Sequence, residues 1–154
     1  MNLEIERRFL IKNNLWRSFI THQVNIIQGY FVLKEKDWTI RIRLEGEKYK
    51  LTLKKHIINS TSHEFEYDIP ANEGEIILSN LDYTIAKERF HLFVNNKHWT
   101  IDCFKDKNYP LIIGEIELQE VNEKIKLPNF IDKEITGIKK FTNFELSQNP
   151  FSIW

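Results

Sequence analysis

Charged side chains alternate with apolar ones in several short segments of this chain, and most segments carry charge of one sign. The acidic positions are Glu4, Glu6, Glu64, Glu66, Asp102, Glu115 and Glu117, and the basic positions are Arg8, Arg41, Arg43, Lys54, Lys87 and Arg89. Carboxylate oxygens bind hard cations such as Mg²⁺ or Mn²⁺. Guanidinium and ammonium groups bind phosphate oxygens. On one shared surface, the two sets would bind a metal-complexed polyphosphate.

The alternation indicates β-strands, because successive side chains of a strand point to opposite faces. We predict eight strands, at residues 2–11, 25–33, 37–45, 48–56, 63–69, 84–94, 97–105 and 112–120. Short helices are expected from Asn13 or Asn14 to about His22, at residues 73–81 and at residues 128–135. Eight strands with few helices favour a closed barrel or a sandwich.

A β-sandwich with wet, charged outer faces is the ordinary alternative, because half-buried antiparallel strands usually have one polar face. The segregation of charge by sign favours the barrel, since a solvated face usually mixes charges and so avoids repulsion. An eight-stranded barrel encloses room for one small ligand. We therefore expect the charges to point inward. The outward apolar faces would be covered by the helices and by aromatic residues such as Trp16.

The bulk composition restricts the class of protein. The chain has 154 residues, which fits a single domain over 1–154, and its formal net charge of zero gives no reason to expect nucleic-acid binding. Cys103 is the single cysteine, and the charged N-terminus does not resemble a signal peptide. No segment has the roughly 20 apolar residues of a membrane span. We expect a cytoplasmic protein; its oligomeric state stays open.

The charged segments occur in an order that resembles the CYTH superfamily, the triphosphate tunnel metalloenzymes. Residues 4–8 (EIERR) are similar to the ExExK signature of that family. The other similar segments are residues 28–30, 39–43 (TIRIR), 49–54 (YKLTLK), 64–70 (EFEYDIP), 87–89 (KER), 99–102, 115–118 (EIEL), 135–137 and 139–141. The resemblance spans nearly the whole chain.

The resemblance implies a mainly β fold, an eight-stranded closed antiparallel barrel that binds triphosphates with Mg²⁺ or Mn²⁺. Known activities of the family are inorganic tripolyphosphatase, thiamine triphosphatase, RNA triphosphatase and adenylate cyclase. Short bacterial members mostly favour inorganic tripolyphosphate, which we expect as substrate, with ATP and thiamine triphosphate as alternatives. An adenylate cyclase and a non-catalytic polyphosphate or nucleotide binder remain open.

The resemblance also suggests roles for the charged residues. We expect Glu4, Glu6, Glu115 and Glu117 to hold the principal metal, and Glu64, Glu66 and Asp102 to serve a second metal or place the attacking water. Phosphate would be bound by Arg8, Arg41, Arg43, Lys54, Lys87 and Arg89, with Lys139 closing the tunnel from the tail. The chemistry is phosphoryl transfer to water, with Arg8, Glu66 and Asp102 as the catalytic candidates.

One residue departs from the signature: Arg8 stands where the family has a lysine. An arginine cannot act as a base at usable pH, although it can bind phosphate through two nitrogens. This substitution is the main support for slow turnover or for a pure binder. The five histidines are predicted at the surface, with His91 on the face of Lys87 and Arg89, and no HxH or HxxxH pair suggests a zinc site.

Overall fold

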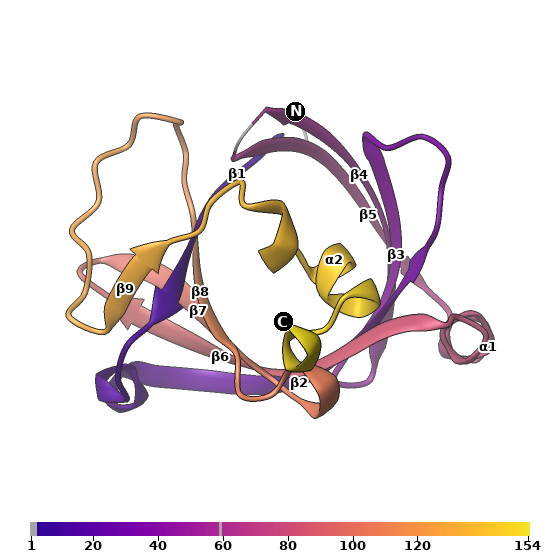
Figure 1. Ribbon diagram of the computed structural model, residues 1–154, viewed down its shortest axis with the longest axis horizontal. Coiled ribbons are helices and arrows are strands. Elements are labelled where there is room, and N and C mark those ends of the chain that lie inside the picture. Colours follow the sequence, from indigo (N-terminus) through magenta and orange to yellow (C-terminus); the bar gives the residue numbers. More distant parts are fainter. Residues whose placement is uncertain (1–2, 59) are drawn as a thin grey trace.

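The computed structural model describes residues 3–58 and 60–154. Eight strands form a closed antiparallel barrel and a ninth lies outside it (Figure 1). The strands are β1 (Leu3–Ile11), β2 (Ile20–Phe31), β3 (Trp38–Glu45), β4 (Lys48–Ile58), β5 (Thr61–Ile69), β6 (Tyr83–Val94), β7 (Lys97–Phe104), β8 (Ile112–Glu117) and β9 (Ile131–Glu134). Around the barrel the order is β1-β5-β4-β3-β2-β6-β7-β8, and β8 pairs with β1.

The strand register gathers the charged residues on one face. Glu6 lies opposite Glu117 and Arg8 opposite Glu115 in the β1–β8 pair. Directly opposed residues of antiparallel strands share a face of the sheet. The same parity continues through the other pairs, with Lys54 opposite Glu64 and Arg89 opposite Asp102. The predicted closed barrel and its inward-facing charges are therefore confirmed.

The outer face of β1, β6, β7 and β8 carries one apolar core. Trp16, on the 3-10 helix η1 (Leu15–Phe19), is fully buried, with its ring centroid 5.1 Å from that of Phe90. Phe130, just before β9, packs on Trp99. These contacts exclude water from the apolar side of the strands, as expected for Trp16 from the sequence.

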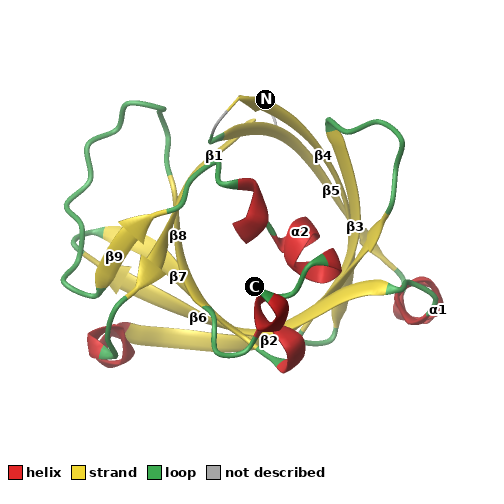
Figure 2. Ribbon diagram, viewed as in Figure 1, coloured by secondary structure: helices red, strands yellow, loops and turns green. Residues whose placement is uncertain are grey.

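The C-terminal segment fills one end of the barrel. Its short helices η3 (Lys139–Phe141), α2 (Asn143–Gln148) and η4 (Phe151–Ile153) lie within the ring of strands (Figure 2). Thr142 caps α2 by accepting a hydrogen bond from the main-chain N–H of Glu145 at 3.2 Å. A second apolar core joins the segment to inward-facing positions of the strands, and it contains Ile85, Phe104, Leu111, Ile113, Ile135, Phe141 and Leu146. The interior is thus apolar at this end and charged beyond it.

Two of the three predicted helices are wrong in part or in full. The helix expected up to His22 is only the short η1, because the alternation of β2 starts at Ile20 and pairs with β6. The helix expected at residues 128–135 is instead extended. There Ile131 is buried in the outer core while β9 pairs with β1, which a helix could not do. The helix expected at residues 73–81 is confirmed as α1 (Ala71–Ser79).

Gly74 explains the close seating of α1 on the barrel. A Cβ atom at this position would lie 2.3 Å from Cγ of Tyr49 on β4. Only glycine allows so close an approach of the helix to the strand. Across the described ranges 3–58 and 60–154, no helix is long and apolar enough to cross a bilayer.

Candidate functional site

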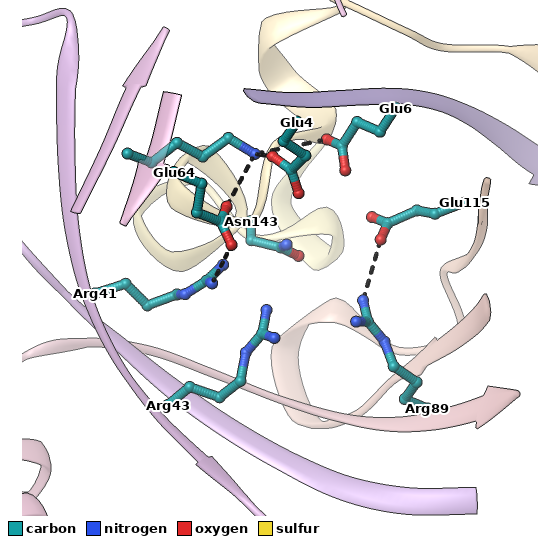
Figure 3. A pocket seen from close by; sticks show the side chains of 9 residues that line it. Glu4, Glu6, Arg41, Arg43, Glu64, Arg89, Glu115 and Asn143 are labelled. Atoms are coloured by element: carbon teal, nitrogen blue, oxygen red, sulfur yellow. Dashed lines mark hydrogen bonds and ion pairs between the residues drawn. The ribbon is translucent and has the colours of Figure 1, made fainter. Parts of the chain in front are cut away.

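A small charged cavity lies inside the barrel. It has a volume of about 90 Å³ and is lined by Glu4, Glu6, Arg41, Arg43, Lys54, Glu64, Arg89, Glu115 and Asn143 (Figure 3). A wider cavity of about 360 Å³ shares Glu4 and Glu64 with it and adds Leu3, Glu66 and Glu117. The lining residues come from six strands and α2, so the closed barrel is what brings them together.

One wall of the cavity carries carboxylates gathered around the ammonium group of Lys54, and Glu64 also lies 3.9 Å from Arg41. The ammonium of Lys54 contacts Glu4 and lies 3.6 Å from Glu64 and 4.0 Å from Glu6. Burial raises the pKa of Glu4 and Glu6, and neighbouring carboxylates raise both further. The same carboxylates, against the effect of burial, raise the pKa of Lys54. The wall holds more negative charge than Lys54 neutralises, which favours an additional cation.

The opposite wall carries guanidinium groups that face one another. Burial and the nearby charges of Arg41 and Arg89 lower the pKa of Arg43 to about 10. Arg43 Nε donates to Gln28 at 3.1 Å, and Arg41 Nη2 donates to Thr52 at 3.0 Å. Arg41 Nε is buried and has no hydrogen-bond partner among the residues that the structure describes. Like charges and an unpaired donor at the same wall favour an anion with several acceptor oxygens.

Glu115 is held between two arginines. Arg8 Nε donates to its carboxylate at 2.9 Å and Arg89 Nη2 at 3.1 Å. Although burial acts in the other direction, Arg8 and Arg89 lower the pKa of Glu115 to about 2. This carboxylate is therefore ionised under all ordinary conditions and faces the cavity as an oxygen donor.

Arg8 links this carboxylate to the C-terminal segment. Its side chain is buried, and Nη1 donates to the main-chain carbonyl of Phe141 at 2.8 Å. The second terminal nitrogen, Nη2, is buried and finds no hydrogen-bond partner within residues 3–58 and 60–154. The side chain thus has one unused donor, next to Glu115.

Asp102 and Lys87 form a fully buried ion pair behind the cavity. Asp102 accepts from Lys87 Nζ at 2.5 Å and from Arg89 at 2.7 and 2.8 Å. Despite its burial, the two cations lower the pKa of Asp102. Burial lowers the pKa of Lys87 to about 8. Lys87 pairs with Asp102 and also lies 3.5 Å from Asn143 Oδ1, and Asp102 holds the guanidinium of Arg89 in position.

Comparison with known proteins agrees with this arrangement. The profile of the CYTH domain family matches residues 2–145. The chain belongs to the CYTH family. It is 33% identical to an inorganic triphosphatase of Acetivibrio thermocellus over 98% of this chain and 97% of that protein. It is 24% identical to an inorganic triphosphatase of Nitrosomonas europaea, over 94% and 96% of the two chains. The crystal structure of an inorganic triphosphatase superposes with a TM-score of 0.68 at 25% identity, covering 94% and 93%.

The barrel of this CYTH protein brings together most of the residues predicted from the sequence. Eight of them line the small cavity: Glu4, Glu6, Arg41, Arg43, Lys54, Glu64, Arg89 and Glu115. Glu66 and Glu117 line the wider one. Arg8, Lys87 and Asp102 lie in the wall behind them.

Lys139 does not lie where the sequence analysis expected it. Its side chain is 85% exposed and its ammonium lies 3.2 Å from Glu145, so it lines neither cavity. Asn143 of the same segment lines the small cavity instead, and the sequence analysis missed it. Residues 142–145 (TNFE) have the pattern of a capping box, which could have shown a helix starting here.

The carboxylates do not form a ready-made metal cage. Throughout the described part of the chain, no three His, Cys, Asp or Glu side chains are grouped to hold a metal ion. Mg²⁺ does not need such a cage, because it commonly binds one or two carboxylates together with substrate phosphates and water. Glu4 and Glu6, with raised pKa values and only Lys54 as a shared counter-ion, fit that mode.

Proposed function

We propose that this CYTH protein hydrolyses inorganic tripolyphosphate with the help of Mg²⁺ or Mn²⁺. The observation that carries the proposal is the division of one cavity into an acidic and a guanidinium wall (Figure 3). A metal-bound polyphosphate is negative where it meets arginine and positive where it meets carboxylate. Its charges therefore complement both walls. The curated relatives that match the whole chain are inorganic triphosphatases, which supports the same conclusion.

Arg41, Arg43 and Arg89 would bind the phosphate oxygens. Their guanidinium groups repel one another, and a polyanion would relieve that repulsion. It would also supply acceptors for the buried Arg41 Nε. Arg8 Nη2 is a further donor in the wall. Lys54 would complete the set from the acidic side.

The lining of the small cavity favours an inorganic substrate. All nine lining side chains are charged or amide groups. A nucleobase or a thiazolium ring needs an apolar or aromatic surface to bind, and this cavity offers none among its described lining residues. We therefore place tripolyphosphate ahead of ATP and thiamine triphosphate, and hydrolysis ahead of cyclisation.

The metal would neutralise the charge that develops on the phosphoryl group. Glu4, Glu6 and Glu115 would hold it, with Glu117 and Glu64 at the wider cavity for a second ion. Glu66, whose pKa is lowered mainly by its hydrogen bond to Lys50 against the effect of burial, stays ionised and would orient the attacking water. Arg8 stays protonated and Asp102 is fully paired, so both would act by positioning Glu115 and Arg89.

The single cysteine, Cys103, is free, which suits the reducing environment of the cytoplasm. We accordingly propose a cytoplasmic protein that acts on a small-molecule triphosphate as one domain.

Phosphate release from tripolyphosphate, with Mg²⁺ and then Mn²⁺ and with ATP alongside, tests the proposal. Glu6→Gln should abolish metal-dependent release, whereas Glu120→Gln, an exposed carboxylate away from the cavity, should leave it unchanged. Tight binding of tripolyphosphate by calorimetry without turnover would make the protein a binder. Cyclic AMP formed from ATP would make it a cyclase. Absence of both binding and turnover would overturn the assignment of the cavity.

A further inference from the structure

A group of three histidines lies at the open end of the barrel, where His98 is near Glu117 of the wider cavity. His91 of β6 and His98 of β7 are joined by a hydrogen bond between Nδ1 of His91 and Nε2 of His98 at 3.0 Å. Their rings are stacked, with centroids 5.1 Å apart and an interplanar angle of 23°. The ring of His22 on β2 lies 5.5 Å from that of His91. None of the three lines either cavity described above.

The strand register explains why these rings meet. His22 lies directly opposite His91 in the β2–β6 pair, and His91 lies opposite Thr100 in the β6–β7 pair. His98 is two residues from Thr100 and therefore on the same face. His91 lies on the same face of β6 as Lys87 and Arg89. Lys87 contacts Asn143 of α2, and His91 lies beyond Arg89 on the side away from that helix. The rings thus stand at the end of the barrel that the C-terminal segment leaves open.

We propose that His91 and His98 chelate a divalent transition-metal ion, with His22 placed to add a third nitrogen. Two imidazole nitrogens on adjacent rigid strands are a bidentate ligand for borderline ions such as Ni²⁺, Cu²⁺ and Zn²⁺. His22 and His98 are exposed, so their rings can turn toward a shared ion. As they stand, the described residues hold no closed three-ligand site, and the chelate therefore rests on the pair.

The spacing of the pair favours some ions over others. With metal–nitrogen bonds of about 2.05 Å, nitrogens 3.0 Å apart subtend about 94° at the ion. That angle is close to the right angle of octahedral Ni²⁺ and tetragonal Cu²⁺ sites. A tetrahedral Zn²⁺ site needs the nitrogens to separate to about 3.3 Å. The two rings face each other in the hydrogen bond and would turn toward any of these ions, and the nitrogen separation then needs less change for Cu²⁺ and Ni²⁺ than for Zn²⁺.

The protonation state of His91 suits metal binding. Burial, and then the charges of His98 and Arg89, lower the pKa of His91 and so favour its neutral form. A neutral imidazole is the form that binds a metal, and the imidazole that donates the hydrogen bond of the pair would take its other tautomer when the ion binds. The ligands are nitrogens, whereas the acidic wall offers only oxygens, and hard Mg²⁺ prefers the latter. Saturating Mg²⁺ should therefore leave the histidine site free.

Calorimetric titration of the untagged full chain with NiCl₂, in excess Mg²⁺, tests the proposal independently of triphosphatase activity. One Ni²⁺ per chain is expected. His91→Gln and His98→Gln should each weaken binding by about tenfold or more, because even residues that only orient a metal ligand contribute that much. His56→Gln, an exposed histidine elsewhere on β4, should bind as the unmodified protein does. Unchanged Ni²⁺ affinity in both His91→Gln and His98→Gln would overturn the proposal.

Electron paramagnetic resonance of the Cu²⁺-loaded unmodified protein gives a result that does not depend on the folding of a variant. Coupling to at least two equatorial imidazole nitrogens is expected, and His98→Gln should remove one of them. A spectrum of oxygen ligands alone, in excess Mg²⁺, would place Cu²⁺ on the acidic wall and rule out the chelate.

Discussion

Arg8 and Glu115 face each other across the paired strands β1 and β8, and Arg8 Nε donates to the Glu115 carboxylate at 2.9 Å. The same guanidinium donates to the carbonyl of Phe141 at 2.8 Å. One side chain therefore fixes both a carboxylate of the cavity and the segment that fills the barrel end. At this position the family signature has a lysine, whose single ammonium cannot reproduce the fork of a guanidinium.

Replacing Arg8 with lysine should consequently affect stability. Arg8→Lys leaves either the Phe141 carbonyl without its side-chain donor or Glu115 with Arg89 as its remaining arginine partner, and we expect the free energy of unfolding to fall by about 1–3 kcal/mol. Urea denaturation measures this change. The matched control is Arg7→Lys, since Arg7 pairs with Glu134 on the more exposed outer face and should lose less than about 1 kcal/mol. Equal losses in the two variants would contradict the linking role of Arg8.

Replacing Arg43 with glutamine should separate binding from stability. Arg43→Gln removes a charge that repels Arg41 and Arg89, so the melting temperature should stay the same or rise. Tripolyphosphate should bind about tenfold more weakly or worse, because a hydrogen bond to a charged group contributes about 1.5–3 kcal/mol. Calorimetry with tripolyphosphate and a thermal melt of the same sample give both values. Lys133→Gln, on the exposed side of β9, should change neither.

Replacing Lys87 with methionine should chiefly destabilise the fold. Lys87→Met takes away one of the two cations that neutralise the buried Asp102, at a cost of about 3 kcal/mol. Lys50→Met breaks an ion pair with Glu66 at the surface and should cost less than about 1 kcal/mol. Denaturation midpoints compare the two variants. A Lys87→Met protein as stable as the parent would show that the lysine is held for the ligand.

Acid should weaken the fold through Glu115. Its pKa is about 2 in the folded protein and 4.5 ordinarily, so the folded state binds this proton less tightly than the unfolded state. The stabilisation is complete above pH 4.5 and is lost as the pH falls toward 2, by up to about 3 kcal/mol. Urea midpoints measured from pH 6 to pH 2 should fall less steeply for Glu115→Gln. Parallel curves for the two proteins would refute this assignment.

Truncating Leu146 should loosen the C-terminal segment. Leu146 is 1% exposed and packs in the apolar core inside the barrel. Leu146→Ala should cost about 2–5 kcal/mol. Amide hydrogen exchange should rise most in α2, which carries Asn143 into the cavity. Ile153→Ala, on an exposed side chain of the same segment, should leave the exchange pattern nearly unchanged.

The sequence predicted the strands and their inward faces because alternation is a local signal. Once Glu6, Arg43 and Arg89 lie on the charged face of their strands, closing the sheet brings them into one cavity. Alternation does not give depth along the barrel, however. Lys87 and Asp102 have the same alternating pattern as Arg89, and yet they lie behind the cavity and form an ion pair with each other. Their separation from the ligand site depends on the stagger of the strands, which no local pattern contains.

The insertion of the C-terminal segment into the barrel could not be predicted from the sequence for a related reason. Ile85, Phe104 and Ile113 hold inward positions but are apolar, and this makes sense only when Phe141 and Leu146 enter the barrel. The partner segment lies far along the chain, so its contribution is a tertiary effect. Lys139 was expected to close the tunnel because residues 139–141 resemble the tail of the family, but the turn at η3 directs it to solvent and brings Asn143 inward.

The filled end of the barrel has a consequence for how ligands would enter and leave the protein. With the C-terminal segment occupying one end, the proposed substrate and its products would share the opening on the side of Glu4, Glu64 and Glu117. A linear polyphosphate would then enter by its terminus, and a long polymer would not pass through the barrel. Each released orthophosphate would have to leave through the same opening before the next substrate enters, so product release and substrate entry would not overlap.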